Sequence, residues 1–184
     1  MKNCIYDWKD IDNAINSLFS DIYSDKWKPD VVVGIIPDSA VISNILSNRL
    51  ETKFETIKID LFSKEPEVEL NCWLPELAFG VNDSSETGIS GARWDPQLRK
   101  NILVCVTQNK AGILERLIND WQDACYPAEK QVWQTVWHRN VRFASMIDYS
   151  DRDINCDYTW KMVDPSEKTK DIFPWDKSFW TQKI

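Results

Sequence analysis

The sequence has few of the residues from which metal and redox sites are built. Its 184 residues include one His, His138, and five widely spaced Cys that form no Cys-x-x-Cys pair. Structural zinc sites need four Cys or His ligands at short, regular spacings. A Cys/His zinc site therefore has little support, no metal ligands are assigned, and the thiols are expected to be reduced, as in a cytoplasmic protein. We expect His138 to be a surface or capping residue rather than a catalyst.

Long apolar runs and an excess of positive charge are also missing. No stretch approaches the roughly 20 apolar residues of a membrane-spanning helix, and the N-terminal MKNCIYDWKD lacks the apolar core of a signal peptide. With 22 basic and 29 acidic residues, the chain has a net charge of −7. An acidic chain without a Lys/Arg cluster has no electrostatic footprint for nucleic acid. We therefore expect neither membrane nor nucleic acid among the partners.

The sequence does contain a regular alternation of helical and strand-like apolar patterns. Residues 10–23 place apolar side chains at helical spacing, and Val31–Ile36 and Ile102–Val106 are apolar at every position, as in strands buried on both faces. The other predicted elements are strands within 52–62, 141–147 and 157–162, a helix capped by Asp38 or Ser39 and ending near Leu50, and a helix from near Ala111 to Trp121. This order predicts one α/β domain over residues 1–184, with a parallel sheet flanked by helices.

Residues 63–99 interrupt this alternation. They contain three Pro and three Gly, and the tract GVNDSSETGISGARWD at 80–95 is typical of a loop. Loops of this length inside a domain are usually functional or disordered. We therefore predict a long flexible loop that includes Ser90 and Arg93.

The order and spacing of the segments resemble those of the type I phosphoribosyltransferases. The similarity is to the short purine-salvage, xanthine–guanine-like enzymes, including tryptophan-rich versions encoded by bacteriophages. KPDVVVGI resembles the strand before the pyrophosphate loop, ILVCVTQNKAG the strand and loop that bind phosphoribosyl pyrophosphate (PRPP), VRFASMIDYS the strand leading to the base site, and FPWD the Pro-Trp segment of the hood. The resemblance covers most of the chain. It implies a Rossmann-like parallel sheet, a long flexible loop and a small C-terminal hood, and it allows a homodimer.

The resemblance also implies a set of site residues. The PRPP loop would contain Val106, Thr107, Gln108, Asn109, Lys110, Ala111 and Gly112. The pyrophosphate loop would contain Ile36, Pro37, Asp38 and Ser39. The base site and hood would contain Asp148, Lys170 and Trp175, and the flexible loop Ser90 and Arg93.

The PRPP loop departs from the family pattern. Family members place two adjacent acidic residues, which hydrogen-bond the ribose hydroxyls, at the positions of Val106 and Thr107. Gly112 is kept, but Leu114 stands where a Thr is expected. Because a hydrogen bond to a charged group contributes roughly 1.5–3 kcal/mol, losing two carboxylates would weaken ribose binding by about two to four powers of ten.

The other two regions depart as well. Asp38 puts a negative charge where pyrophosphate is held in the family, and Pro37 removes a backbone donor, which leaves Ser39 as a usable one. Asp148 stands at the position of the Lys that meets the purine, and Lys170 at that of the stacking aromatic residue.

These departures leave three functions open. The first is a phosphoribosyltransferase-fold pseudoenzyme with lost or much reduced transfer activity, which binds a nucleotide phosphate, free phosphate or PRPP through Lys110 and the helix N-terminus after it. The competing interpretation of TQNKAG is a plain polar turn. The second is an active, divergent purine phosphoribosyltransferase, with magnesium held by Asp38, Asp60 or residues 82–86 and Arg93 closing over pyrophosphate.

The third function is protein interaction through tryptophans, because aromatic residues are enriched at interfaces. The chain has ten Trp. The candidate contacts are Trp73, Trp133, Trp137, Trp175 and Trp180.

Overall fold

Five parallel strands form the centre of the protein, in the order β3-β2-β6-β7-β8. The computed structural model describes residues 2–59, 73–82, 93–110, 112–124, 133–149, 154–164 and 166–181. The strands are β2 (Val31–Ile36), β3 (Lys53–Lys58), β6 (Ile102–Asn109), β7 (Val141–Tyr149) and β8 (Tyr158–Val163). Each neighbouring pair is parallel. The predicted α/β architecture with a parallel sheet is confirmed.

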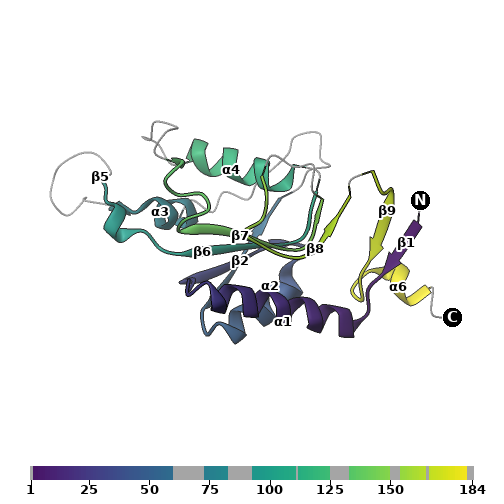
Figure 1. Ribbon diagram of the computed structural model, residues 1–184. Coiled ribbons are helices and arrows are strands. Elements are labelled where there is room, and N and C mark those ends of the chain that lie inside the picture. The colour runs from purple at the N-terminus through teal and green to yellow at the C-terminus, as the bar shows by residue number, and fades with distance from the viewer. Residues whose placement is uncertain are drawn as a thin grey trace.

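Helices cover both faces of this sheet (Figure 1). Helices α1 (Trp8–Ser24) and α2 (Ala40–Arg49) lie on one face, and α3 (Trp73–Phe79) and α4 (Ile113–Ala124) lie on the other. Alternate residues of β2 and β6 serve the two layers: Val32 packs in the α1/α2 core and Val33 in the α3/α4 core. This double burial is why the strands are continuously apolar in the sequence.

The N-terminus of α1 is fixed by a capping box. The Asp7 side chain accepts from the backbone N–H of Asp10, and the Asp10 side chain accepts from the N–H of Asp7. The predicted side-chain cap of α2 is wrong. Ser39 occupies the cap position with helical dihedrals, and its hydroxyl donates to the Ile35 carbonyl instead of accepting from the first turn.

A smaller unit, here called the hood, lies beyond the carboxyl end of the sheet (Figure 1). It consists of β1 (Lys2–Ile5), β9 (Thr169–Ile172) and α6 (Lys177–Thr181), with β1 and β9 paired in parallel. The sequence predicts a C-terminal hood but not the N-terminal strand, because four mostly exposed residues give no clear alternation.

Two boundaries differ from the sequence prediction. The predicted loop over 63–99 contains α3, a two-stranded ribbon of β4 (Val81–Asn82) and β5 (Arg93–Trp94), and a 3₁₀ turn at Pro96–Leu98. Pro75 is tolerated because it lies in the first turn of α3. Residues 60–72 and 83–92 lie outside the described residues.

The second difference concerns the strand before the PRPP loop. Strand β6 runs to Asn109 rather than Val106, because its pairing with β7 continues to Asn109 opposite Asp148. Thr107, Gln108 and Asn109 are therefore strand residues, not loop residues.

Among the described residues, no helix is both long and apolar enough to cross a membrane.

Candidate functional site

The candidate site is the carboxyl edge of the sheet, where β2, β6 and β7 end beside the hood. Ligands of open α/β sheets bind at this edge, because the helices that follow the strands begin there. The loop after β2 contains a cis peptide bond between Ile36 and Pro37. The structure brings this loop next to the end of β6.

Thr107 joins β6 to the loop after β2. Its side chain is buried, with 3% of the residue exposed, and its hydroxyl donates to the backbone carbonyl of Asp38 at 2.8 Å. The donor at this position is therefore used within the protein. Ser39 is also occupied, because both its N–H and its hydroxyl donate to the Ile35 carbonyl.

Two carboxylates and one ammonium group meet at this edge. Removal of water by the surrounding protein raises the pKa of the Asp38 carboxyl, and the negative charge of Asp176 raises it further. The nearby Lys110 ammonium lowers the pKa of Asp38. Asp176 lies in the turn before α6 and accepts from the Phe173 N–H at 2.8 Å. The edge therefore has mixed charge rather than the purely positive charge that suits an anion.

Asp171 of β9 ties the hood to the sheet. It accepts from the Gln108 side chain at 3.0 Å and from the Tyr149 hydroxyl. Burial and this carboxylate raise the pKa of Tyr149 to about 12, and they also raise the pKa of Tyr6. Lys161 donates to the Tyr6 hydroxyl at 3.2 Å. Both phenols are therefore neutral near neutral pH, and the space between the sheet edge and the hood contains protein hydrogen bonds.

Asp148 belongs to a buried network beneath this edge. Only 2% of it is exposed, and its carboxylate accepts from the Asn109 side chain at 2.9 Å and from the Cys156 N–H at 3.1 Å. Asn109 also donates to the Ile154 carbonyl at 2.9 Å. These contacts tie Ile154 and Cys156, which precede β8, to the ends of β6 and β7.

Lys110 and Gly112, just before α4, are the described residues of the predicted PRPP loop that follow β6. Gly112 has φ +72°, a left-handed conformation that favours glycine, and its carbonyl accepts from the Arg116 N–H. The exposed Lys110 places its ammonium 5.7 Å from the centre of the Tyr149 ring. The predicted helix start near Ala111 shifts to Ile113, and Ala111 lies outside the described residues.

The structure places the other predicted site residues as follows. Trp175 stacks on Phe173, with ring centres 5.1 Å apart and planes inclined by 8°. Lys170 is an exposed residue of β9 opposite Asn3. Ser90 lies outside the described residues, and Arg93 is described only as part of the backbone of β5.

Neither a cluster of metal ligands nor the histidine belongs to the described edge. Over the parts of the chain that the structure describes, no three His, Cys, Asp or Glu side chains gather as a metal site; Asp60 and residues 83–86 lie outside those parts. The chain's single His, His138, lies before β7 at the opposite edge of the sheet, where it pairs with Asp157 at 3.1 Å. This pairing raises the pKa of His138.

Sequence reasoning missed the residues that link the sheet to the hood, namely Tyr6, Tyr149, Asp171 and Asp176. Tyr149 and Asp171 are 22 residues apart, and Tyr6 comes from the other end of the chain. The available signal was the predicted hood itself, because its placement over the sheet edge would have drawn attention to the polar residues of its strands.

No protein-family model matches the sequence, and no curated protein matches it significantly. Solved structures do match. A purine phosphoribosyltransferase from Pyrococcus horikoshii is 16% identical with a TM-score of 0.64, covering 96% of both chains. A xanthine-guanine-hypoxanthine phosphoribosyltransferase from Helicobacter pylori is 14% identical with a TM-score of 0.63, covering 98% of both. A hypothetical protein from Neisseria gonorrhoeae with bound ppGpp is 14% identical with a TM-score of 0.60, covering 99% of this chain and 94% of that one.

These similarities extend over nearly the whole chain and include the hood. The protein therefore has the type I phosphoribosyltransferase-like fold that its sequence predicts.

Proposed function

We propose that this phosphoribosyltransferase-fold protein has lost, or retains very little of, PRPP-dependent transfer and acts as a binding module for a nucleotide phosphate. The observation that carries the proposal is the bond from Thr107 to the Asp38 carbonyl. The resemblance to the family implies a ribose-binding carboxylate at this position. This chain instead has a buried hydroxyl, and that hydroxyl already donates to a backbone carbonyl of the same chain.

The missing ribose contacts are expected to weaken PRPP binding. Val106 is buried and apolar, and Thr107 offers no charge, so neither replaces a carboxylate. Two missing charge-assisted hydrogen bonds correspond to a weakening of about two to four powers of ten in PRPP affinity. A phosphate group alone does not need these contacts, since Lys110 and the N–H groups that open α4 can hold it.

The proposal is tested by calorimetric titration with PRPP and magnesium, and separately with GMP. We expect GMP to bind more tightly than PRPP and no nucleotide to form from PRPP and purine bases. Lys110→Ala should weaken GMP binding by about ten- to a hundredfold, in line with the loss of one charged contact. Lys168→Ala, which removes an exposed ammonium just before β9, should leave GMP affinity unchanged. Micromolar PRPP binding together with base-dependent turnover would refute the proposal.

A second prediction concerns the charge of Asp38. Asp38→Asn should raise GMP affinity about three- to tenfold at neutral pH, because the ionised carboxylate repels phosphate beside Lys110. The pKa of Asp38 is higher in the folded protein than in the unfolded chain, where it is about 4. The free energy of unfolding therefore falls as the pH rises from about 4 through the raised pKa, because the unfolded chain ionises first. The variant should therefore be slightly more stable than wild type at neutral pH and no more stable at pH 3. Calorimetry and urea unfolding at the two pH values check both parts, and a lower GMP affinity would contradict this account.

One observation favours a second candidate function, an active transferase. Besides burial, the negative charge of Asp176 raises the pKa of the Asp38 carboxyl, so both carboxylates belong to this edge. Paired carboxylates can bind magnesium together with water and the oxygens of a phosphorylated substrate. This candidate predicts that PRPP binds only with magnesium and that Asp176→Asn abolishes that dependence, whereas the first proposal predicts little PRPP binding under either condition.

A further inference from the structure

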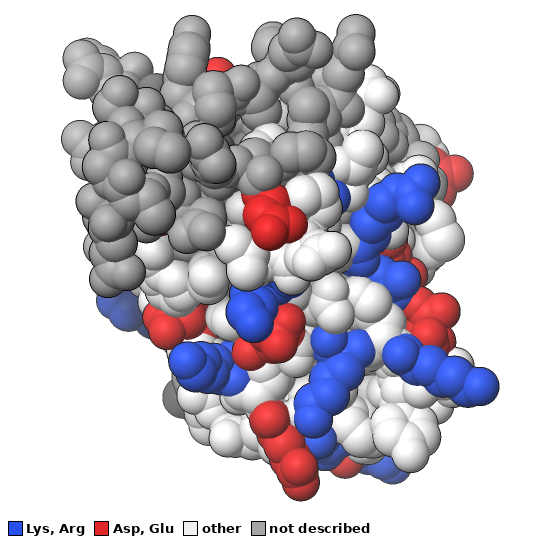
Figure 2. All heavy atoms as spheres, turned by 90° about the vertical axis from the view of Figure 1, so that its left-hand side faces the viewer, with Lys and Arg blue, Asp and Glu red and all other residues white. Residues whose placement is uncertain are grey.

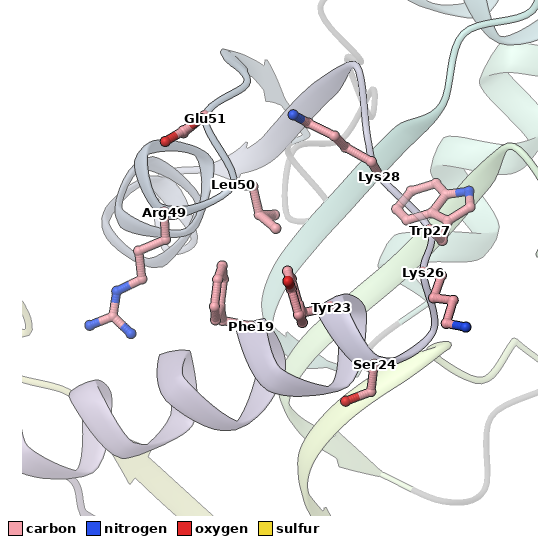
Figure 3. A pocket seen from close by; sticks show the side chains of 9 residues that line it. All are labelled: Phe19, Tyr23, Ser24, Lys26, Trp27, Lys28, Arg49, Leu50 and Glu51. Atoms are coloured by element: carbon pink, nitrogen blue, oxygen red, sulfur yellow. The ribbon is translucent and has the colours of Figure 1, made fainter.

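A pocket lies at the opposite, amino edge of the sheet. Its volume is about 860 Å³, and it is formed where α1 and α2 end, next to the segment that leads into β2 (Figure 3). The residues that line it are Phe19, Tyr23, Ser24, Lys26, Trp27, Lys28, Arg49, Leu50 and Glu51. None of them belongs to the carboxyl edge described above.

The walls of this pocket are aromatic and apolar. Phe19 and Tyr23 stand one turn apart on α1 with ring centres 6.1 Å apart and planes inclined by 23°, and Leu50 faces them from the end of α2 (Figure 3). The Trp27 ring forms the opposite side. Tyr23 is 75% exposed, which is a large apolar surface to leave in water. A flat aromatic body would cover the Phe19, Tyr23 and Leu50 side chains together.

The rim of the pocket is basic, although the whole chain has a net charge of −7. Lys26 and Lys28 are exposed, and Arg49 is held in part by Asp12 at 2.9 Å. Glu51 is the acidic residue of the lining. A smaller hollow of about 360 Å³ adjoins it, shares Lys28 and Glu51, and adds Lys53 together with Asp30, whose carboxylate accepts from the Asn101 N–H. Figure 2 views this end of the molecule, where Lys and Arg side chains lie interspersed with Asp and Glu side chains.

We propose that this amino-edge pocket binds a small aromatic anion, meaning a planar aromatic body that carries a phosphate, carboxylate or sulfonate group. The rings would contact Phe19, Tyr23 and Trp27, and the anionic group would lie by Lys28 where the two hollows meet. A volume of 860 Å³ falls within the roughly 300–1,000 Å³ of small-molecule sites, which are mostly apolar with a few charged groups at the margin. The charge complementarity with the basic rim selects an anion over a neutral aromatic compound.

The test follows the indole N–H signal of Trp27 by NMR, assigned with Trp27→Phe. Three probes are titrated: 1-naphthoate, AMP, and the neutral 1-naphthalenemethanol. We expect the two anions to shift the Trp27 signal in a saturable way and the neutral compound to bind about five- to tenfold more weakly. Comparison of the two anions separates the sources, since tighter binding of AMP indicates a nucleoside phosphate and tighter binding of naphthoate an aromatic carboxylate.

Surface variants locate the site. Lys28→Glu and Tyr23→Ala, both at exposed positions, should each weaken anion binding by about five- to tenfold. Lys9→Glu makes the same charge change at the other end of α1 and should have no effect, and Lys110→Ala should also have none, which separates this pocket from the carboxyl-edge site. The proposal is overturned if millimolar anion leaves the Trp27 signal unmoved, if the neutral compound binds equally well, or if the signal shifts with protein concentration alone, as a second copy in the pocket would cause.

Discussion

Replacing Trp133 by Ala is expected to lower the free energy of unfolding by about 3–5 kcal/mol, the usual cost of removing a buried aromatic side chain. Trp133 is 0% exposed. Its ring stacks on Trp137 with centres 5.1 Å apart and lies 4.8 Å from the ring of Phe79. Truncation leaves a cavity between α3 and the turn before β7, lined by the rings of Phe79 and Trp137. Urea unfolding followed by far-ultraviolet circular dichroism measures the loss.

Trp180→Ala is the matched control. Trp180 is 59% exposed on α6, so the same substitution should change stability by less than about 1 kcal/mol. Equal losses for the two variants would contradict the burial difference on which the prediction depends. The difference also corrects the interaction hypothesis, in which Trp133 was one of the candidate surface contacts. Trp73 and Trp180 remain exposed, whereas Trp133 is a core residue.

Much of the central fold could be predicted because its signals are local. Apolar spacing of 3.6 residues marks α1, and continuous apolar runs mark β2 and β6. Strand β1 was missed because its stability comes from pairing with β9 near the other end of the chain. The extension of β6 beyond Val106 was missed for a similar reason, since polar Gln108 and Asn109 continue the strand only because β7 lies beside them.

The candidate site was less predictable than the fold. The resemblance located the loops after β2 and β6, and the structure brings them together through Thr107 and Asp38. The resemblance did not indicate which hydrogen-bond partner each polar side chain has. Whether a hydroxyl faces a ligand or its own backbone depends on contacts such as this one, which joins residues 69 positions apart. Asp148 illustrates the same limit, because its sequence position implied a base site and its surroundings imply a role in stability.

Asp148→Asn is therefore expected to destabilise the protein by about 2–4 kcal/mol, a result that a ligand-facing residue would not give. The carboxylate accepts two hydrogen bonds, from the Asn109 amide and the Cys156 N–H, in a position that is 2% exposed. An Asn side chain has the same size, but its NH₂ group replaces one of the two accepting carboxylate oxygens. This NH₂ group would then face a donor, either the Asn109 amide or the Cys156 N–H. The charge-assisted bond that is lost contributes about 1.5–3 kcal/mol, and the buried donor left without a partner adds to the cost.

Urea unfolding of Asp148→Asn and of Asp21→Asn, an exposed position on α1, separates this effect from a general effect of charge. The control should change stability by less than about 0.5 kcal/mol. A double-mutant cycle of Asn109→Ala with Asp148→Ala should give a coupling of about 1–3 kcal/mol, because the two side chains share a hydrogen bond. If Asp148→Asn kept wild-type stability but changed the affinity for a purine nucleotide, Asp148 would instead belong to the base site that its sequence position implies. The stability and the binding measurement on one variant thus decide whether this carboxylate holds the fold or a ligand.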